Sequence, residues 1–528
     1  MPKFIPYDYR QNTMVVVNFQ DQIQPGTFEY ALHYLIEQKL DLSVFDPQYH
    51  NDEAGRPAYS PAILLKIILF AYSKGITSSR EIQWCCDTNI LFKALSCDTV
   101  PHYTTIASFI SGFPFQIESV FEQVLLVCHQ QGLLGNELFA IDGCKLPSNA
   151  AKQWSGTFKE LTAKRKKLRK LIRYHLQRHR EFDSRDAGEA EQQQRTAQTI
   201  ATLSAAADKI GEFLKKSEPR MGKAQRPTEV KSNITDNDSA KMTTSKGTIQ
   251  GYNGIAAVDS KHQIVISAMA IGEGQEQHSL QPVLAAIKAR FQRLKISRNA
   301  YKDGIIVTAD TGYASEANMA YLKTNSINAY IPDNQFRSRD PKFTDHKGKY
   351  GKKPAVTGKP WDGAKRTGVI PASEFVFDAK ALTCRCPEGN LLSYRGTREN
   401  RDGDTVAHFE GRLLQCRHCP LKAKCMVNPK AADDGKGKGR QVSFVVKKRK
   451  HSTTPYTDWM KTRIDSDAGK AIYSHRMSVV EPVFGNVTCN KRLRRFSLRG
   501  STKVNGQWQL FCLVHNIEKL QNYGSLGQ

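Results

Sequence analysis

IIVTADTGYAS, residues 305–315, begins as an apolar run and then breaks at Asp310, Thr311 and Gly312. A short apolar run that ends in turn-forming residues is typical of a buried β-strand. The strand would therefore present the carboxylate of Asp310 at its end. Two kinds of site use such an aspartate: the paired-aspartate centre of a pepsin-like protease, and a metal-binding centre.

Further strands are predicted on both sides of this position. LFAIDGCKL, residues 138–146, is predicted as a short strand ending in Asp142, and residues 253–272 as two strands joined by a turn around Lys261. The pattern then predicts a helix over 277–294, the strand before Asp310, a helix over 315–325 and a last strand over 328–333. This order predicts a mixed α/β fold, and it is the order of a ribonuclease H-like core.

Length and charge narrow the class of protein. The chain has 528 residues, too many for a single hydrophobic core, so we expect several domains or large insertions. Lys and Arg number 77 against 51 Asp and Glu, a formal charge of +26, which favours a polyanionic partner such as nucleic acid. No secretory signal is evident, and the most apolar run, residues 61–72, is too short to cross a membrane. We therefore expect a cytoplasmic, nucleoid-associated protein without membrane contact.

The first 135 residues are predicted to form a helical N-terminal domain. Residues 27–134 contain several capped amphipathic segments, and Ser60 followed by Pro61 is a typical helix start. Short helices joined by tight turns are compatible with a helix-turn-helix that reads DNA. A plain helical bundle is the alternative.

The predicted catalytic core begins at residue 136, and its first part, 136–330, carries an insertion over 152–225. Ten Lys or Arg residues and one acidic residue, Glu160, lie between Lys159 and Arg180. A second segment has apolar residues at alternating spacings of three and four, the pattern of a helix–helix seam. We predict a basic helical hairpin that contacts the DNA backbone; a solvated coiled coil without a ligand is the alternative. Its predicted DNA-binding residues are Lys164, Arg165, Lys166 and Lys167.

A second insertion, residues 331–464, contains five cysteines. Cys416 and Cys419 form a CxxC pair, and Cys425 with either Cys384 or Cys386 would complete four thiolates. Four thiolates make a closed tetrahedral zinc site, which stabilises a fold and does no chemistry. Scattered reduced thiols are the alternative.

The C-terminal segment, residues 465–528, is predicted to complete the core with a helix that carries Glu481. Tyr473, Arg476, Val480, Phe484 and Val487 suggest one helix face, with Glu481 set among them. A carboxylate on an apolar face needs a charged partner, either a metal ion or an arginine. The basic run KRLRR follows and supplies candidate DNA-binding residues, namely Lys491, Arg492, Arg494 and Arg495.

Three carboxylates therefore stand out: Asp142, Asp310 and Glu481. Oxygen ligands of this kind suit Mg²⁺ or Mn²⁺. Two such ions can activate a water or a 3′-hydroxyl and stabilise the leaving oxygen in a displacement at phosphorus. With the basic composition, these residues predict metal-dependent chemistry on nucleic acid.

The chain resembles the DDE transposases of bacterial insertion sequences, nearest to the group known as insertion sequence eleven eighty-two. The resemblance extends from about residue 20 to 522, and its most specific parts are EPVFG and RFSLRG in the C-terminal segment. Other matching segments are YSPAILLKIILFAYSKGITSSREI, FAIDGCKLPSNAAK, TDNDSAKMTTSKGTIQGYNGIAAVD and ADTGYAS.

The resemblance implies a ribonuclease H-like core with Asp142, Asp310 and Glu481 as its triad and two Mg²⁺ or Mn²⁺ ions, and with Tyr473 and Arg476 as DNA-binding partners on the glutamate helix. It favours Cys386 over Cys384 as the fourth zinc ligand. Many relatives have a lysine seven residues after the glutamate, where this chain has Thr488.

The expected function is therefore binding of terminal inverted repeats and target DNA by a homodimer, with strand cleavage and strand transfer. A DNA-binding repressor with an inactive transposase core is the main alternative, and a ribonuclease H-type nuclease acting on RNA–DNA hybrids is a third. The pepsin-like interpretation requires a second DTG or DSG element, and the chain has none.

Overall fold

The computed structural model describes ten stretches of the chain, and all structural statements below refer to them: residues 16–49, 57–183, 190–223, 227–245, 247–302, 304–342, 369–400, 404–435, 437–447 and 455–526. The chain divides into two compact units. Unit 1 comprises Met1–Arg339 and Pro455–Gln528, and unit 2 comprises Asp340–Thr454. No helix within the described stretches is both long enough and apolar enough to cross a bilayer.

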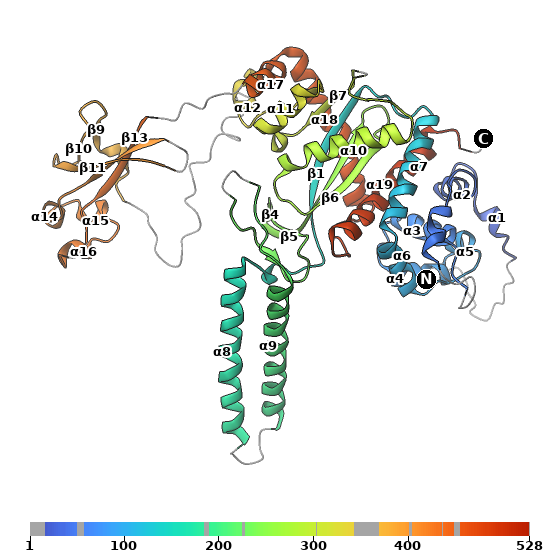
Figure 1. The fold of residues 1–528 in the computed structure, drawn as a ribbon, viewed down its shortest axis with the longest axis horizontal. Coiled ribbons are helices and arrows are strands. Elements are labelled where there is room, and N and C mark those ends of the chain that lie inside the picture. The colour runs from blue at the N-terminus through green and yellow to red at the C-terminus, as the bar shows by residue number, and fades with distance from the viewer. Residues whose placement is uncertain are drawn as a thin grey trace, which may run out of the picture. The chain divides into compact units, whose positions relative to one another are not determined.

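Unit 1 is built on a mixed six-stranded sheet (Figure 1). β1 pairs antiparallel with β5 and parallel with β7; β8 continues the parallel edge, and β4 and β6 pair antiparallel with β5. The strands are β1 (Leu138–Pro147), β4 (Ala240–Thr244), β5 (Gly247–Asp259), β6 (Val265–Ile271), β7 (Ile306–Ala309) and β8 (Asn328–Tyr330). The strand pair, turn and following helices and strands that the sequence predicts after residue 253 are all present.

One prediction about this sheet is wrong. β1 does not end at Asp142 but continues to Pro147, because β5 pairs with it from Phe139 to Pro147. The parallel partner β7, in contrast, pairs only with Leu138–Ile141. Asp142 is therefore the first residue of β1 beyond the reach of β7.

Helices of the C-terminal segment pack on this sheet together with the N-terminal helices. Apolar residues of α19 contact β6 on one side and α2, α3, α6 and α7 on the other, and Tyr72 stacks on Phe511 with ring centroids 4.3 Å apart. Ser60 caps α3 by accepting a hydrogen bond from the Ala62 N–H, as its sequence predicts. The N-terminal helices are α1 (Phe19–Gln22), α2 (Phe28–Gln38), α3 (Pro61–Ser73), α4 (Ser79–Thr88), α5 (Ile90–Ser96), α6 (Tyr103–Gly112) and α7 (Pro114–Gln130). The later helices of unit 1 are α10 (Leu280–Arg293), α11 (Glu316–Thr324), α12 (Phe336–Arg339), α17 (Pro455–Asp465), α18 (Asp467–Gly485) and α19 (Ser501–Tyr523).

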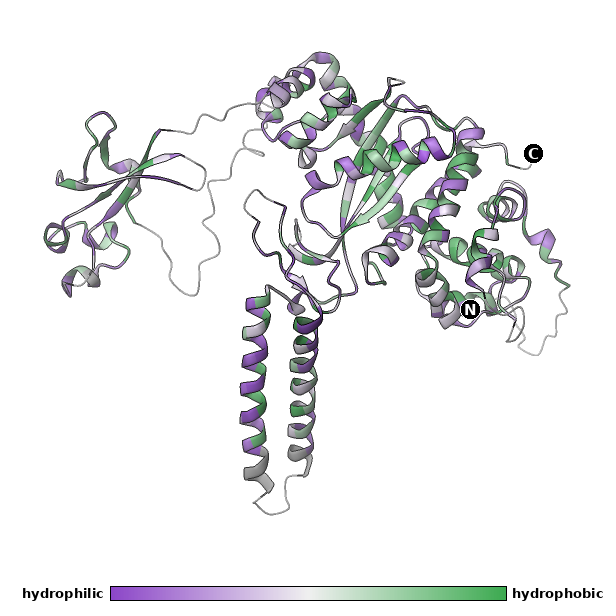
Figure 2. Cartoon of the chain, in the orientation of Figure 1, coloured by the Kyte–Doolittle hydropathy of each residue, from purple (hydrophilic) through white to green (hydrophobic). Residues whose placement is uncertain are grey.

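Two long helices, α8 (Phe158–Asp183) and α9 (Ala190–Lys216), run side by side away from the sheet (Figure 1). Short strands β2 (Ser155–Gly156) and β3 (Ser232–Asn233) pair at their base. Ala207 and Ile210 are buried in the seam between the helices, whereas hydrophilic residues dominate α8 (Figure 2).

Unit 2 contains a five-stranded antiparallel sheet in the order β13-β12-β11-β10-β9. Its own small core includes Phe409, Val442 and Cys384. The strands are β9 (Val376–Asp378), β10 (Thr383–Arg385), β11 (Leu391–Glu399), β12 (Thr405–Glu410) and β13 (Gln441–Lys447), and the short helices are α14 (Leu413–Arg417), α15 (Lys422–Cys425) and α16 (Lys430–Asp433).

Candidate active site

Asp142 and Asp310 lie next to each other at the edge of the sheet. Ile141 pairs with Ala309 in the last register position of the parallel β1–β7 pair, so each aspartate is the next residue along its own chain segment. Each carboxylate also accepts a hydrogen bond from the following backbone N–H, Gly143 at 2.8 Å and Thr311 at 2.6 Å. The end of β7 therefore brings together two acids 168 positions apart in numbering and gives them the same local geometry.

The guanidinium of Arg476 lies between these two acids. Its Nη1 donates to Asp142 Oδ2 at 2.7 Å, and its Nη2 lies 3.9 Å from Asp310 Oδ1. The Arg476 side chain is only 8% exposed, so this pair of carboxylates shares one largely buried cation. Burial by itself lowers the pKa of Arg476, but the charge and hydrogen bond of Asp142, together with Tyr473 and Asp310, outweigh it, so the pKa lies above its ordinary value.

Tyr473, one turn earlier on α18, completes the contact with Asp310. Its hydroxyl donates to Asp310 Oδ1 at 3.3 Å, and its ring packs edge-on against Phe336. Burial raises the pKa of Tyr473, so the phenol stays protonated and remains a hydrogen-bond donor. Tyr473 and Arg476 thus hold the two acids from one helix face.

Helix α18 is held by a cap at its start and by a side-chain hydrogen bond from Gln263 further along. Ser466 caps its start by accepting from the Gly469 N–H. Pro482 has no N–H to donate to the Ser478 carbonyl four residues earlier, and the side chain of Gln263 donates to that carbonyl instead at 3.0 Å. A π-helical turn, Asn486–Asn490, follows directly and contains Thr488.

A third acid near this pair, Glu276, was not found by sequence reasoning. Its carboxylate forms an ion pair with Lys145 of β1 at 3.1 Å, and a Cβ on Gly312 would come within 2.1 Å of its Oε2. The hydroxyl of Tyr313 is buried without a hydrogen-bond partner in the described residues, and burial, with the charges of Asp142 and Glu276, raises its pKa. Glu276 lies in a short turn before α10, where no periodic pattern distinguishes it from any exposed acid.

Glu481 is placed differently from the expectation. It does not lie on the buried face of α18: Arg476, Val479, Val480 and Val483 are buried, but Glu481 is exposed and contacts neither Asp142 nor Asp310 through a hydrogen bond or ion pair. The five residues after Arg476 turn the helix by about 140°, which carries Glu481 away from the buried stripe. Within the described stretches, no three His, Cys, Asp or Glu side chains are grouped closely enough to hold a metal ion.

Two regions of the chain match models of known protein families. Residues 385–521 match the transposase DDE domain, and residues 17–112 match a transposase domain, DUF772. These two matches support a DDE transposase of the insertion-sequence type. A comparison with curated proteins found no match. The DDE-domain match includes α18 with Arg476 and Glu481, whereas Asp142 and Asp310 lie outside it.

The basic residues after α18 differ in exposure. Lys491, a predicted DNA-binding residue, is buried, 1% exposed, and its Nζ pairs with Glu518 at 2.6 Å, so its charge faces the interior. Burial lowers its pKa, which the Glu518 carboxylate partly offsets. Arg492, Arg494 and Arg495 are exposed, and Arg495 also donates to the Ser148 carbonyl near the end of β1.

The four predicted DNA-binding residues of the hairpin also fall into two groups, packed and exposed. Lys164 donates to the Gln153 carbonyl at 2.6 Å and lies over the ring of Trp154, so it anchors the base of α8. The Arg165 guanidinium packs against Gly211, where a Cβ would come within 2.6 Å of it. Lys166 and Lys167 are exposed. Lys164 therefore packs at the base of the hairpin and Arg165 packs against α9, whereas Lys166 and Lys167 lie on the outer surface.

Four of the five clustered cysteines line one small cavity in unit 2, of about 30 Å³: Cys386, Cys416, Cys419 and Cys425. Cys384 lies on β10 and does not line this cavity; it packs with Phe375 and Leu392 in the buried core of unit 2, which also includes Cys425. Burial raises the pKa of the Cys425 thiol, and the charge of Arg440 opposes that shift.

Proposed function

We propose that this transposase binds the terminal inverted repeats of an insertion sequence and target DNA, and that it cleaves and joins strands at the site formed by Asp142, Asp310 and Glu481. The observation that carries the proposal is the pairing of Asp142 with Asp310 around one buried cation. The strand order, with three antiparallel strands followed by two parallel ones, supports a ribonuclease H-like core.

The donor set fits divalent metal ions. Two adjacent carboxylates supply hard oxygen ligands, and the Arg476 guanidinium between them shows that this position favours positive charge. We propose that Asp142, Asp310 and Glu481 hold Mg²⁺ or Mn²⁺, which would supply an activated nucleophile and stabilise the leaving oxygen. Glu481 is on the same helix as Arg476 and is exposed, so it would join the site from α18.

Residues of the chain would position the DNA around this centre. Arg476 would turn from Asp142 toward a phosphate oxygen, since guanidinium groups bind phosphates as well as carboxylates. Tyr473 would keep its proton and orient Asp310. Exposed arginines after α18, with Lys166 and Lys167, would contact the DNA backbone. The two element ends require two copies of the chain, and we propose a homodimer on DNA.

Cleavage of DNA carrying the element ends tests this proposal. Asp142→Asn, Asp310→Asn and Glu481→Gln should each abolish metal-dependent cleavage and leave DNA binding intact, because the neutral amides keep the shape of the side chain but not its charge. The exposed Asp434→Asn and Glu388→Gln are matched controls that should cleave normally. Full cleavage by any of the three site variants would refute the triad. Intact DNA binding without any cleavage by the wild type in Mg²⁺ or Mn²⁺ would instead favour a repressor with an inactive core.

We also propose that Cys386, Cys416, Cys419 and Cys425 hold a structural Zn²⁺ in unit 2. Their shared cavity supports this ligand set, and Cys384 is left out of it because it does not line that cavity. Metal analysis of the purified protein should find one zinc per chain, lost in Cys416→Ser and retained in Cys489→Ser, whose thiol is exposed outside the cluster. Equal zinc content in both variants would reject the site.

A further inference from the structure

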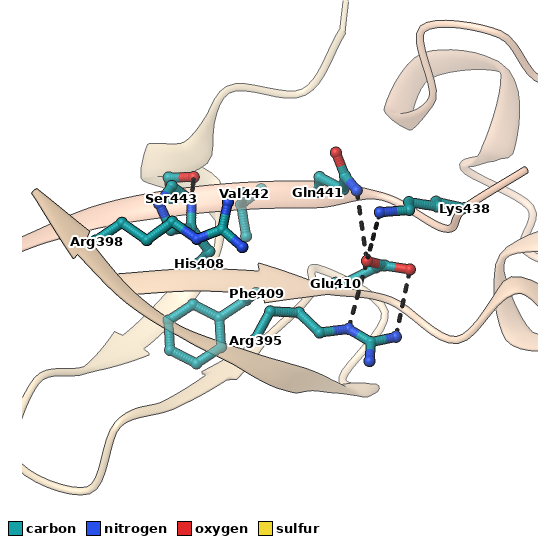
Figure 3. Close-up of a pocket in the computed structure, with 9 residues that line it drawn as sticks. All are labelled: Arg395, Arg398, His408, Phe409, Glu410, Lys438, Gln441, Val442 and Ser443. Carbon is teal, nitrogen blue, oxygen red and sulfur yellow. Dashed lines mark hydrogen bonds and ion pairs between the residues drawn. The ribbon is translucent and has the colours of Figure 1, made fainter. Parts of the chain in front are cut away.

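One face of the unit 2 sheet carries a basic hollow of about 560 Å³ that belongs to none of the sites above. We call it the β-basin. It lies over β11, β12 and β13, and Figure 3 shows its polar side chains extending over the same face. Its lining residues are Arg395, Arg398, His408, Phe409, Glu410, Lys438, Gln441, Val442 and Ser443.

Among the residues that line the β-basin, Glu410 is the one acidic residue, and two basic side chains form ion pairs with it. Figure 3 shows its carboxylate between Arg395 and Lys438. Arg395 Nε lies 3.4 Å from Glu410 Oε2, Lys438 Nζ lies 4.0 Å away, and the Gln441 side chain donates at 3.4 Å. The Glu410 side chain is 12% exposed, whereas Arg395 and Lys438 are 59% and 69% exposed. Glu410 therefore fixes the base of the cluster and leaves its cations facing outward.

These ion pairs are weak and can be exchanged for contacts with a ligand. The Glu410 carboxylate is largely buried, but its two cations are exposed and held at 3.4 and 4.0 Å, so each can turn from the carboxylate toward a ligand. The Arg398 side chain is exposed and forms no hydrogen bond or ion pair with any described residue. Three cations against one carboxylate leave the β-basin with an excess of positive charge on a concave polar surface.

We infer that the β-basin binds the phosphate backbone of double-stranded DNA, as a second contact separate from the catalytic site. Two arginines and a lysine on one face match the spaced negative charges of a DNA strand, and guanidinium groups bind phosphate oxygens in pairs. Basic residues also outnumber acidic ones in the sequence of unit 2. The inference rests on DNA being the substrate, as proposed above.

The test is equilibrium binding of the full-length protein to a fluorescently labelled DNA duplex of random sequence, about 40 base pairs long, measured by anisotropy between about 50 and 200 mM salt without Mg²⁺. Arg395→Ala together with Arg398→Ala should lower the slope of log Kd against log salt by about 2, since each lost phosphate contact removes about 0.9. The matched control is Lys380→Ala with Lys424→Ala, two exposed cations of unit 2 outside the β-basin, which should leave the slope unchanged. An unchanged slope in the arginine variant, or an equal change in the control, would overturn the inference.

A crosslink locates the contact independently. Val445 is 46% exposed and aligns with Arg398 through Val406 in the register of β11, β12 and β13. A photoreactive benzoylphenylalanine at position 445 should crosslink to the DNA, whereas one at Leu414, exposed on α14 outside the β-basin lining, should not. DNA crosslinked only from position 414 would contradict the inference. Because neither measurement involves cleavage, both outcomes are separate from success or failure of the proposed triad.

Discussion

At the scale of single residues, Arg476 balances the negative charge of the candidate active site. Its largely buried guanidinium lies 2.7 Å from Asp142 and 3.9 Å from Asp310, and it offsets the repulsion between the two carboxylates. A metal ion at the proposed site would have to compete with Arg476 for the oxygens of Asp142. In the structure Arg476 holds the two aspartates together, and in the proposed metal-bound state it would have to move away.

Arg476→Met should strengthen Mn²⁺ binding to the DNA-free protein. The substitution removes the competing cation and keeps much of the apolar stem, so we expect an affinity gain on the order of tenfold, about 1.4 kcal/mol. Calorimetric titration of Mn²⁺ measures it, with the exposed Arg494→Met as control. Unchanged or weaker Mn²⁺ binding in Arg476→Met would show that the guanidinium does not compete with metal.

His515 should make the stability of unit 1 depend on pH. Burial lowers its pKa from 6.5 to about 3, and its Nε2 lies 2.9 Å from the Gln263 carbonyl oxygen. The unfolded chain binds a proton below pH 6.5 that the folded chain does not accept until about pH 3, so stability falls as the pH drops below 6.5. Denaturant midpoints between about pH 7.5 and 5 should decline in the wild type and decline less in His515→Gln. The exposed His475→Gln should behave as the wild type, and parallel profiles for all three proteins would exclude His515 as the cause.

At the scale of elements, α18 is fixed by a contact that compensates for its internal proline. The side chain of Gln263 donates to the Ser478 carbonyl, which Pro482 leaves without its usual partner. The turn between β5 and β6 holds Gln263 at a φ of +60°, which directs it toward α18. This contact ties the position of the helix carrying Arg476 and Glu481 to the sheet.

A double-mutant cycle between Gln263 and Pro482 should measure how much the hydrogen bond from Gln263 to the Ser478 carbonyl contributes to stability. Gln263→Gly removes the side chain without straining a backbone at positive φ, and Pro482→Ala restores the helical N–H. We expect Gln263→Gly to cost about 1 kcal/mol more in the wild-type background than in the Pro482→Ala background, as judged by chemical denaturation. Lys519→Met removes a partner of Gln263 that does not contact Ser478, so its cycle with Pro482→Ala should show no coupling. Additive effects in the first cycle would mean that Gln263 does not replace the missing donor.

Local patterns in the sequence predict the elements better than the pairings between them. The β5–β6 pair, α10, β7, α11 and β8 all follow from apolar periodicity and turn residues. The placement of Asp142 beside Asp310 depends on a parallel register between strands separated by the hairpin, β5, β6 and α10, which no local pattern contains. The exposure of Glu481 was missed because it directly follows Val480, one of the five residues assigned to the buried face. An apolar pattern of five residues does not fix the edge of that face closely enough to place an adjacent residue. The burial of Lys491 depends on Glu518 of a later helix, and basic runs by themselves suggest exposure.

At the scale of the whole molecule, the chain consists of two units with different sources of stability. In unit 1 a continuous hydrophobic core extends from Phe28 through the sheet to Leu520, and α19 contributes to it along most of its length. Gly506 of α19 allows close approach to α7, since a Cβ there would lie 3.1 Å from Pro114. The N-terminal helices should therefore unfold together with the sheet. Unit 2 has only a small core of its own.

Removal of zinc should consequently unfold unit 2 alone. A core as small as that of unit 2 buries too little apolar surface to be stable unaided, and a bound metal would contribute folding free energy directly. Hydrogen exchange measured by mass spectrometry, before and after treatment with a zinc chelator, should show loss of protection in β10–β13 and unchanged protection in β1, β5 and α19. Cys416→Ser should reproduce the effect without chelator, and Cys489→Ser should not. Retained protection in β10–β13 after complete zinc removal would show that the sheet is stable without metal, and loss in both units would show that their folding is coupled.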